Sequence, residues 1–261
     1  MSENSPYTVV ARNFSAANEN RIHSDEIARK FGFRGALVPG VAVYGHLSWP
    51  LVNRFGTAWL AQSVDNLRLL KPAYHDDQLT ISLSDVDDGS QQVHCHNQLG
   101  ELLATLHSQS KPLPDPEDLS LLSATPRDPA RVEIAWDTIT PHQPFEPWQV
   151  QLNQADNANY TDQVADTQDL YQKDLVHPHW LLSLANTALT RQYIMPTWIH
   201  VGSETRHRAA LHIDDTITIK SVPLEKWQKK GHEFIRIWVT FWRGEELTTD
   251  ILHTAIFKVA S

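Results

Sequence analysis

Asp76-Asp77-Gln78-Leu79-Thr80-Ile81 recurs in the second half of the chain as Asp214-Asp215-Thr216-Ile217-Thr218-Ile219. Both copies start with a pair of aspartates and continue with alternating polar and apolar residues, which is typical of a turn that leads into a β-strand. A single match of this length could arise by chance. Further matches at the same spacing would indicate an internal repeat.

Three further pairs of segments support such a repeat. Two have the spacing that carries Asp76 onto Asp214, namely Leu37-Val38 with Leu175-Val176 and residues 7–14 with 145–152. The third, Leu106-His107-Ser108 with Leu252-His253-Thr254, has a spacing larger by eight, which predicts a hairpin that is eight residues longer in the second half. The sequence therefore predicts two copies of one domain in a single chain.

A proline-rich stretch separates the two copies. Five prolines fall between residues 109 and 130: Pro112, Pro114, Pro116, Pro126 and Pro129. Because proline lacks the backbone N–H and fixes φ, such a stretch favours an extended connector over a helix or a central strand. We expect an N-terminal domain at 1–115, a linker at 116–131 and a C-terminal domain at 132–261.

Bulk composition excludes several classes of protein. The 261 residues carry a formal charge of −9 and have no basic run, so neither nucleic acid nor an anionic membrane is expected as a partner. The single cysteine, Cys95, cannot form an internal disulfide, and the first residues lack the features of a secretory signal. No apolar run approaches the ~20 residues that span a bilayer. These features predict a cytoplasmic protein.

Each copy is expected to contain a short helix followed by a long buried helix. Ser24 is a suitable N-cap for a helix over 25–31, and Gly32 suits the position after its end. Residues 41–55 are apolar on every side, which indicates a helix surrounded by protein, although Pro50 should kink or end it. The counterpart runs over 178–189.

The rest of each copy alternates as strands do. In residues 234–241, Ile235, Ile237, Val239 and Phe241 share one face, while Arg236, Trp238 and Thr240 share the other. This pattern predicts an antiparallel sheet with one buried and one solvated face, curled around the buried helix. Two such sheets in one chain can join edge to edge, which protects their edge strands. The predicted fold class is α+β.

Polar residues capable of catalysis precede the first long helix. Asn18-Glu19-Asn20-Arg21-Ile22-His23 is followed sixteen residues later by Pro39-Gly40, where the helix begins. Backbone N–H groups at a helix N-terminus attract developing negative charge, and a histidine titrating near neutrality can move protons beside it. This combination indicates chemistry on a carbonyl group.

The block from Phe14 to Gly40 resembles the signature of the MaoC-like, R-specific enoyl-CoA hydratases and dehydratases. That signature runs Asp-x-Asn-Pro-x-His, then a short helix, an apolar pair and His-Gly at the start of the central helix; Asn20, His23 and Gly40 match it here. The resemblance implies a double hot-dog fold over nearly the whole chain. It also implies an acyl-CoA or acyl-carrier-protein thioester as substrate, no further cofactor and a homodimer as one possible assembly.

Two departures from the signature bear on the reaction. Asn18 stands where the family has its catalytic aspartate, and Arg21 stands where it has proline. An amide orients water but cannot accept its proton, and the loss of a general base typically costs ~10²- to 10⁴-fold in rate. Glu19 and Asp25 remain candidates for a substitute carboxylate.

The resemblance assigns roles to four residues. His23 is expected to act as general acid and base, Asn18 to orient water or the thioester carbonyl, and the Gly40 N–H to polarise that carbonyl. Asn20 is grouped with Gly40 in substrate binding and can support the loop. Plainer explanations are that Gly40 only permits tight packing and that the two asparagines only bond local backbone.

The second copy has lost the signature. At the spacing of the repeat, the positions of Asn18, Asn20, His23 and Gly40 hold Asp156, Ala158, Thr161 and Pro178. We therefore expect one site per chain, in the first half, with the second half completing the walls of an acyl channel. His94-Cys95-His96 and His177-Pro178-His179 lack further ligands at a recognisable spacing, so no metal is expected.

The predicted function is that of an acyl-thioester enzyme of the R-specific hydratase or dehydratase type. A hot-dog acyl-CoA thioesterase is the first alternative, because a positioned water could attack the carbonyl directly. The second alternative is a protein that binds acyl thioesters without turning them over.

Overall fold

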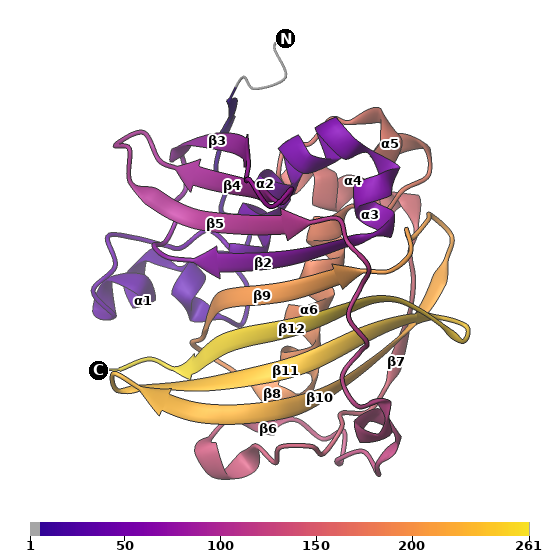
Figure 1. Ribbon diagram of the computed structural model, residues 1–261. Coiled ribbons are helices and arrows are strands. Elements are labelled where there is room, and N and C mark those ends of the chain that lie inside the picture. Colours follow the sequence, from indigo (N-terminus) through magenta and orange to yellow (C-terminus); the bar gives the residue numbers. More distant parts are fainter. Residues whose placement is uncertain (1–5, 261) are drawn as a thin grey trace.

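The computed structural model describes residues 6–260 and contains one large antiparallel sheet (Figure 1). The five strands of the first half are, in sheet order, β1 (Tyr7–Val10), β3 (Gln78–Asp85), β4 (Gln91–His96), β5 (Leu102–Gln109) and β2 (Ser63–Leu69). The second half continues with β9 (Ile199–His207), β12 (Glu246–Lys258), β11 (His232–Arg243), β10 (Thr216–Lys229) and β7 (Trp148–Gln151). The two halves thus contribute strands in the same order, read outward from the middle.

The halves join edge to edge through β2 and β9. These strands pair antiparallel from Ser63, opposite His207, to Arg68, opposite Gly202. The expected joining of two sheets is confirmed, and the pairing satisfies backbone groups that would otherwise form two open edges.

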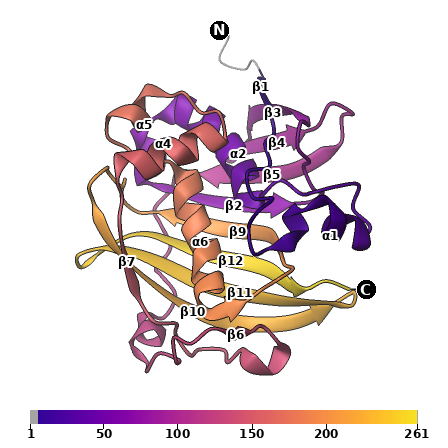
Figure 2. The ribbon, with the colours of Figure 1, turned by 180° about the vertical axis from the view of Figure 1, so that it is seen from behind.

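Two long helices lie on one face of the sheet, α2 (Gly40–Phe55) against the first half and α6 (Pro178–Gln192) against the second; Figure 2 shows this face, with the helices in front of the strands. Eleven of the sixteen residues of α2 are buried, as expected for a helix that is apolar on every side. The smaller elements are α1 (Asp25–Lys30), α3 (Thr57–Ala61), α4 (Gln154–Gln163), α5 (Asp169–Lys173), the single 3₁₀ turns η1 (Arg21–His23), η2 (Leu119–Ser123) and η3 (Trp136–Thr138), and a parallel pair, β6 (Val132–Glu133) and β8 (Tyr193–Ile194). Within residues 6–260, no helix has the length and apolar character needed to cross a bilayer.

Several local predictions hold. The helix α1 follows Ser24 and is succeeded by Gly32, whose φ of 81° is in the left-handed region that glycine tolerates. The hairpin of the second half is also longer, as expected. Ile81 pairs with Cys95, whereas the equivalent Ile219 pairs with Phe241, and the second of these spans exceeds the first by eight residues.

Of the two effects expected of Pro50, ending the long helix is excluded, because the helix continues to Phe55. One match of the internal repeat is wrong in its register. The match of residues 7–14 with 145–152 is three residues out of register. Tyr7 pairs with Ile81, and the residue that pairs with the equivalent Ile219 is Trp148, three positions after residue 145. Between its first strand and its long helix, the second half has the ten-residue α4 and the five-residue α5, where the first half has η1 and α1.

The outer face of the sheet is not uniformly solvated. Trp238 and Thr240, expected to face water, are fully buried. The chain between β5 and β6 runs down the outer face of the second-half strands, where Figure 1 shows it in front of β9, β12 and β11. Glu117 of this connector contacts Arg206 of β9, so the connector provides the cover that strand alternation alone could not predict.

Candidate active site

A cavity of about 200 Å³ lies where the two halves meet. Asn20, His23, Gly40 and Lys71 of the first half line it, together with Trp198 and His200 of the second. Most of its remaining walls are apolar and are contributed by Ile22, Phe33, Leu37, Val38, Val43, Leu69, Ile199 and Val201. A few polar groups converging on an apolar hollow are the usual composition of a small-molecule site.

His23 lines the cavity, and each of its two ring nitrogens has a neighbour at hydrogen-bond distance. Its Nδ1 lies 2.8 Å from the carbonyl oxygen of Leu37. Because a carbonyl can only accept, Nδ1 carries the hydrogen and Nε2 keeps its lone pair. Burial lowers the pKa of His23, although the hydrogen bond to Leu37 opposes the shift. His23 is therefore a neutral imidazole at pH 7, with the proton-accepting atom at Nε2.

Asn20 connects the loop that carries His23 to the second half through hydrogen bonds. Its Nδ2 donates to the carbonyl of Trp198 at 3.0 Å, and the N–H of Trp198 donates back to its Oδ1 at 3.2 Å. Nδ2 also lies 3.4 Å from Nε2 of His23. Both ends of the Asn20 amide thus hold the loop against the second half.

Gly40 is the first residue of α2 and lines the cavity. The backbone N–H groups of a first helical turn have no acceptor within the helix, so they can bind a ligand oxygen. A Cβ at this position would overlap the side chain of Leu69 and lie 2.9 Å from Nδ1 of His200. The packing explanation and the chemical explanation for this glycine therefore both have structural support.

Asn18 is not brought to the cavity. It is exposed, in the turn before η1, and it does not line the hollow. The two candidate substitute carboxylates are also engaged elsewhere, since Glu19 pairs with Arg131 and Asp25 accepts from the N–H of Ala36. Among residues 6–260, no aspartate or glutamate lines this cavity.

The second half supplies lining residues that no sequence motif indicated. They are Asn186 of α6, Trp198 just before β9 and His200 of β9. They become identifiable once the β2–β9 pairing is known.

The corresponding positions of the second half are occupied by structural contacts. His177, just before α6, is fully buried and bonds Asp166 at 3.1 Å, and Nδ1 of the buried His179 lies 3.2 Å from the carbonyl of Tyr160. Asp156 is exposed in the first turn of α4, where it bonds Asn153. No cluster of three or more potential metal ligands occurs in the described part of the chain, residues 6–260.

A ten-stranded antiparallel sheet built from two halves, each wrapped around one long helix, defines the double hot-dog fold. Solved structures with this fold resemble the chain over nearly its full length. A conserved hypothetical protein from Mycobacterium tuberculosis, described as having a double hot-dog fold, matches with a TM-score of 0.66 and 13% identity, covering 98% of this chain and 96% of that one.

A protein from Chloroflexus aurantiacus J-10-fl assigned as a MaoC domain dehydratase matches with a TM-score of 0.65 and 15% identity, covering 97% and 93% of the two chains. One from Lactobacillus plantarum assigned as an oleoyl thioesterase matches at 0.52 and 10%, covering 100% and 98%. No protein-family model matches the sequence, and no curated protein is similar to it. The structural similarity establishes the fold, and it is shared by dehydratases and thioesterases.

Proposed function

We propose that the chain is an enzyme acting on acyl thioesters of coenzyme A or an acyl-carrier protein, of the R-specific enoyl hydratase or dehydratase type. The observation that carries the proposal is His23, a neutral imidazole in an apolar cavity at the N-terminus of a buried helix. The dehydratases of similar fold support the same class of reaction.

In the proposed hydration, the thioester carbonyl oxygen lies against the N–H of Gly40. Nε2 of His23 takes a proton from water as the water oxygen bonds to the β-carbon of the enoyl group. The electrons of the double bond move toward the carbonyl oxygen, where the helix N-terminus stabilises the charge. The proton is then delivered to the α-carbon, and dehydration is the reverse sequence.

One observation favours thioester hydrolysis as a second candidate. No carboxylate among the described residues lines the cavity, so a water molecule there has the imidazole of His23 and not the pair of groups that the signature implies. A single imidazole and an oxyanion site suffice for a water molecule to attack a thioester carbonyl. The fold of the oleoyl thioesterase is compatible with this reaction.

Two assays on the intact protein separate the candidates. A hydratase lowers the ultraviolet absorbance of an enoyl-CoA without releasing thiol, whereas a thioesterase releases free thiol from a saturated acyl-CoA. A protein that only binds acyl-CoA does neither, yet it is stabilised against thermal unfolding by the ligand.

Changing His23 to Ala tests the site. We expect turnover to fall by ~10²- to 10⁴-fold, because the proposed general base is lost. His75→Ala, at an exposed histidine, is the matched control and should leave turnover unchanged. Asn18→Ala should change kcat/KM by less than about twofold, since Asn18 does not reach the cavity. Full activity of the His23 variant would refute the proposed site.

A further inference from the structure

His200 is a second imidazole in the cavity. It is only 7% exposed, and its Nδ1 has no hydrogen-bond partner within residues 6–260. This atom lies 2.9 Å from the point where a Cβ on Gly40 would sit, so it is adjacent to the N-terminus of α2. A buried polar atom without a partner carries a cost, unless a ligand or water supplies that partner.

A β-bulge in β9 orients this histidine. Ala255 of β12 is opposite His200 and Thr254 is opposite Gly202, so Val201 is an extra residue without a partner. In a regular strand, residues three apart point to opposite faces. The bulge removes that constraint, and both His200 and Ser203 are buried, in hydrogen-bond contact with each other. Bulges of this kind commonly re-aim side chains beside active sites.

A hydrogen-bonded chain continues from the other nitrogen of His200. Nε2 lies 2.9 Å from Oγ of Ser203, and the same Oγ lies 3.0 Å from Nδ1 of His253. The rings of His200 and His253 are stacked with their centroids 4.3 Å apart. The serine hydroxyl has one proton to donate, so the chain can run in only two directions.

The two directions differ in what they leave without a partner. If Ser203 donates to His253, then Nε2 of His253 carries a hydrogen that is buried without an acceptor within residues 6–260. If Ser203 donates to His200, then Nδ1 of His253 donates to Ser203, and Nε2 of His253 is only an unused lone pair. Each direction therefore leaves one buried imidazole N–H without an acceptor within residues 6–260, on Nε2 of His253 in the first and on Nδ1 of His200 in the second. Of the two residues, His200 lines the cavity, where water or a ligand can accept that hydrogen bond. The second direction is therefore favoured, and it places a hydrogen on Nδ1 of His200, facing the cavity.

His200 stays neutral at physiological pH. Burial lowers its pKa to about 3, with the backbone of Gly202 opposing the shift. A neutral imidazole N–H can donate a hydrogen bond to a carbonyl without introducing a full charge into an apolar site. Such a donor can stabilise an enolate or a tetrahedral oxyanion as negative charge develops there.

We propose that the Nδ1–H of His200 is a second hydrogen-bond donor to the thioester carbonyl oxygen, beside the N–H of Gly40. Ser203 and His253 are positioning residues that fix its tautomer. This inference rests on the proposed function, because it assigns the residue to the same carbonyl. It gives a role to each of the two imidazoles that line the cavity, where the described lining residues include no carboxylate.

The kinetic test replaces His200 with Phe, which keeps a planar ring and removes both nitrogens. We expect kcat to fall by ~10²- to 10³-fold with a small change in KM, as for the loss of one oxyanion donor. Ser203→Ala should give a smaller fall, because His200 remains but its tautomer is no longer fixed. His94→Phe, on β4 outside the cavity, is the matched control, and thermal unfolding of each variant verifies that it is folded.

Unchanged kcat in a folded His200→Phe variant would overturn the inference. The proposed function would still stand in that case, provided that the His23→Ala variant is inactive. A wild-type protein that converts no acyl thioester would overturn the proposed function itself.

Nitrogen-15 NMR of the histidine rings gives a readout that does not depend on turnover. In the free wild-type protein, we expect His200 to carry its hydrogen on Nδ1, and Ser203→Ala to shift it toward a mixture of tautomers. A hydrogen found on Nε2 of His200 in the wild type would overturn the inference.

Discussion

At the scale of single residues, the shape of the cavity depends on Gly40, which has no side chain. Gly40 allows Leu69 and His200 to approach the first turn of α2, where any Cβ would overlap the leucine. The close approach brings a helix N-terminus and the imidazoles of His23 and His200 into one cavity.

Gly40→Ala should therefore damage function more than stability. Displacing Leu69 and His200 costs ~1–3 kcal/mol of unfolding free energy, the usual range for overpacking. It also moves the carbonyl site, so kcat/KM should fall at least ~10-fold. Urea unfolding and acyl-thioester kinetics measure the two effects. Gly35→Ala is the control, because its Cβ would meet only an oxygen of the exposed Asp25 at 3.2 Å. Equal losses in the two variants would contradict the argument.

The sequence allowed part of this site to be predicted. His23, Asn20 and Gly40 were grouped from their spacing, and the structure has all three lining one cavity. Asn18 was grouped with them, but it is exposed. The direction of a side chain in an irregular loop depends on backbone turns that spacing does not encode. His200 was not foreseen because it reaches the cavity through a bulge and through pairing with a strand of the other half.

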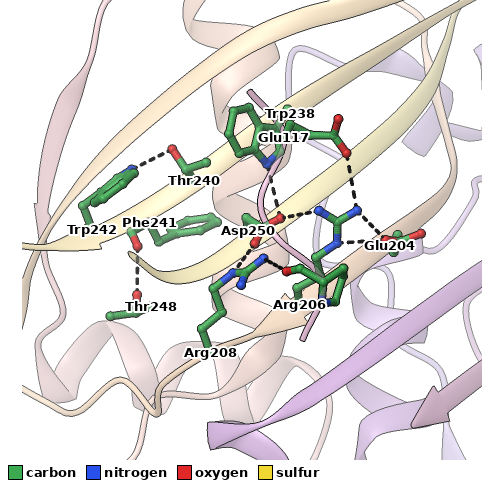
Figure 3. Close-up of polar contacts among 11 residues, drawn as sticks. Glu117, Glu204, Arg206, Arg208, Trp238, Thr240, Phe241, Trp242, Thr248 and Asp250 are labelled. Atoms are coloured by element: carbon green, nitrogen blue, oxygen red, sulfur yellow. Dashed lines mark hydrogen bonds and ion pairs between the residues drawn. The ribbon is translucent and has the colours of Figure 1, made fainter. Parts of the chain in front are cut away.

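At the scale of elements, the connector and the outer face of the sheet are held together by charge (Figure 3). Asp250 of β12 is fully buried and accepts hydrogen bonds from Arg206, Arg208 and Trp238. The connector adds Glu117, which is 3.5 Å from Arg206, and the carbonyl of Pro114, which accepts from Arg208.

Asp250→Asn should destabilise the fold strongly. It removes the charge that balances Arg206, whose side chain is only 7% exposed, and breaking a buried pair from one side costs ~3–5 kcal/mol. Glu117→Gln is the matched control. Its side chain is 39% exposed, so its loss should cost less than about 1 kcal/mol. Guanidinium unfolding followed by tryptophan fluorescence measures both, and similar losses would show that Asp250 does not organise the cluster.

Periodicity predicted most of the elements but not what covers them. The long helices and the strands of the second half follow the apolar patterns in the sequence, including the hairpin longer by eight residues. The solvated outer face was wrong at Trp238 and Thr240. Alternation reports which residues share a face, whereas the path of a proline-rich connector across that face is a tertiary property.

At the scale of the whole molecule, several imidazoles are buried in the interior. Burial lowers the pKa of His46 and His207 to about 4 and of His200 to about 3, and it lowers the pKa of His179 and His253 well below the usual range. All five imidazoles are therefore neutral in the folded protein near pH 7, and they bind protons more weakly there than in the unfolded chain.

Acid should therefore destabilise this protein over a defined pH range. Folded-state pKa values below the unfolded value of 6.5 mean that these histidines contribute full stability above pH 6.5 and lose it as pH falls toward 4. Each contributes up to ~1.4 kcal/mol per pH unit. Burial raises the pKa of Asp65 from 3.8 to about 7. Asp65 lies 3.5 Å from His207, so the two groups titrate as a pair, and the stability that Asp65 gains as pH falls offsets the stability that His207 loses.

Unfolding free energies measured by urea titration from about pH 7.5 to about pH 4.5 test this expectation. His46→Leu is an informative variant, because both ring nitrogens of His46 are buried without partners within residues 6–260. We expect this variant to be more stable at about pH 5 and to show a shallower pH dependence, by about one proton. A stability profile that is flat across this range would contradict the assignment of neutral buried histidines.

The seam between β2 and β9 has a consequence for how such a molecule can diverge. If two identical half-length chains associated through that seam, every substitution would appear twice and the assembly would have to keep two equivalent sites. A covalently fused pair escapes this symmetry, so one member can keep its reactive loop while the other acquires α4, Pro178 and a histidine-rich interior. Fusion thus lets the two halves contribute different residues to a single cavity.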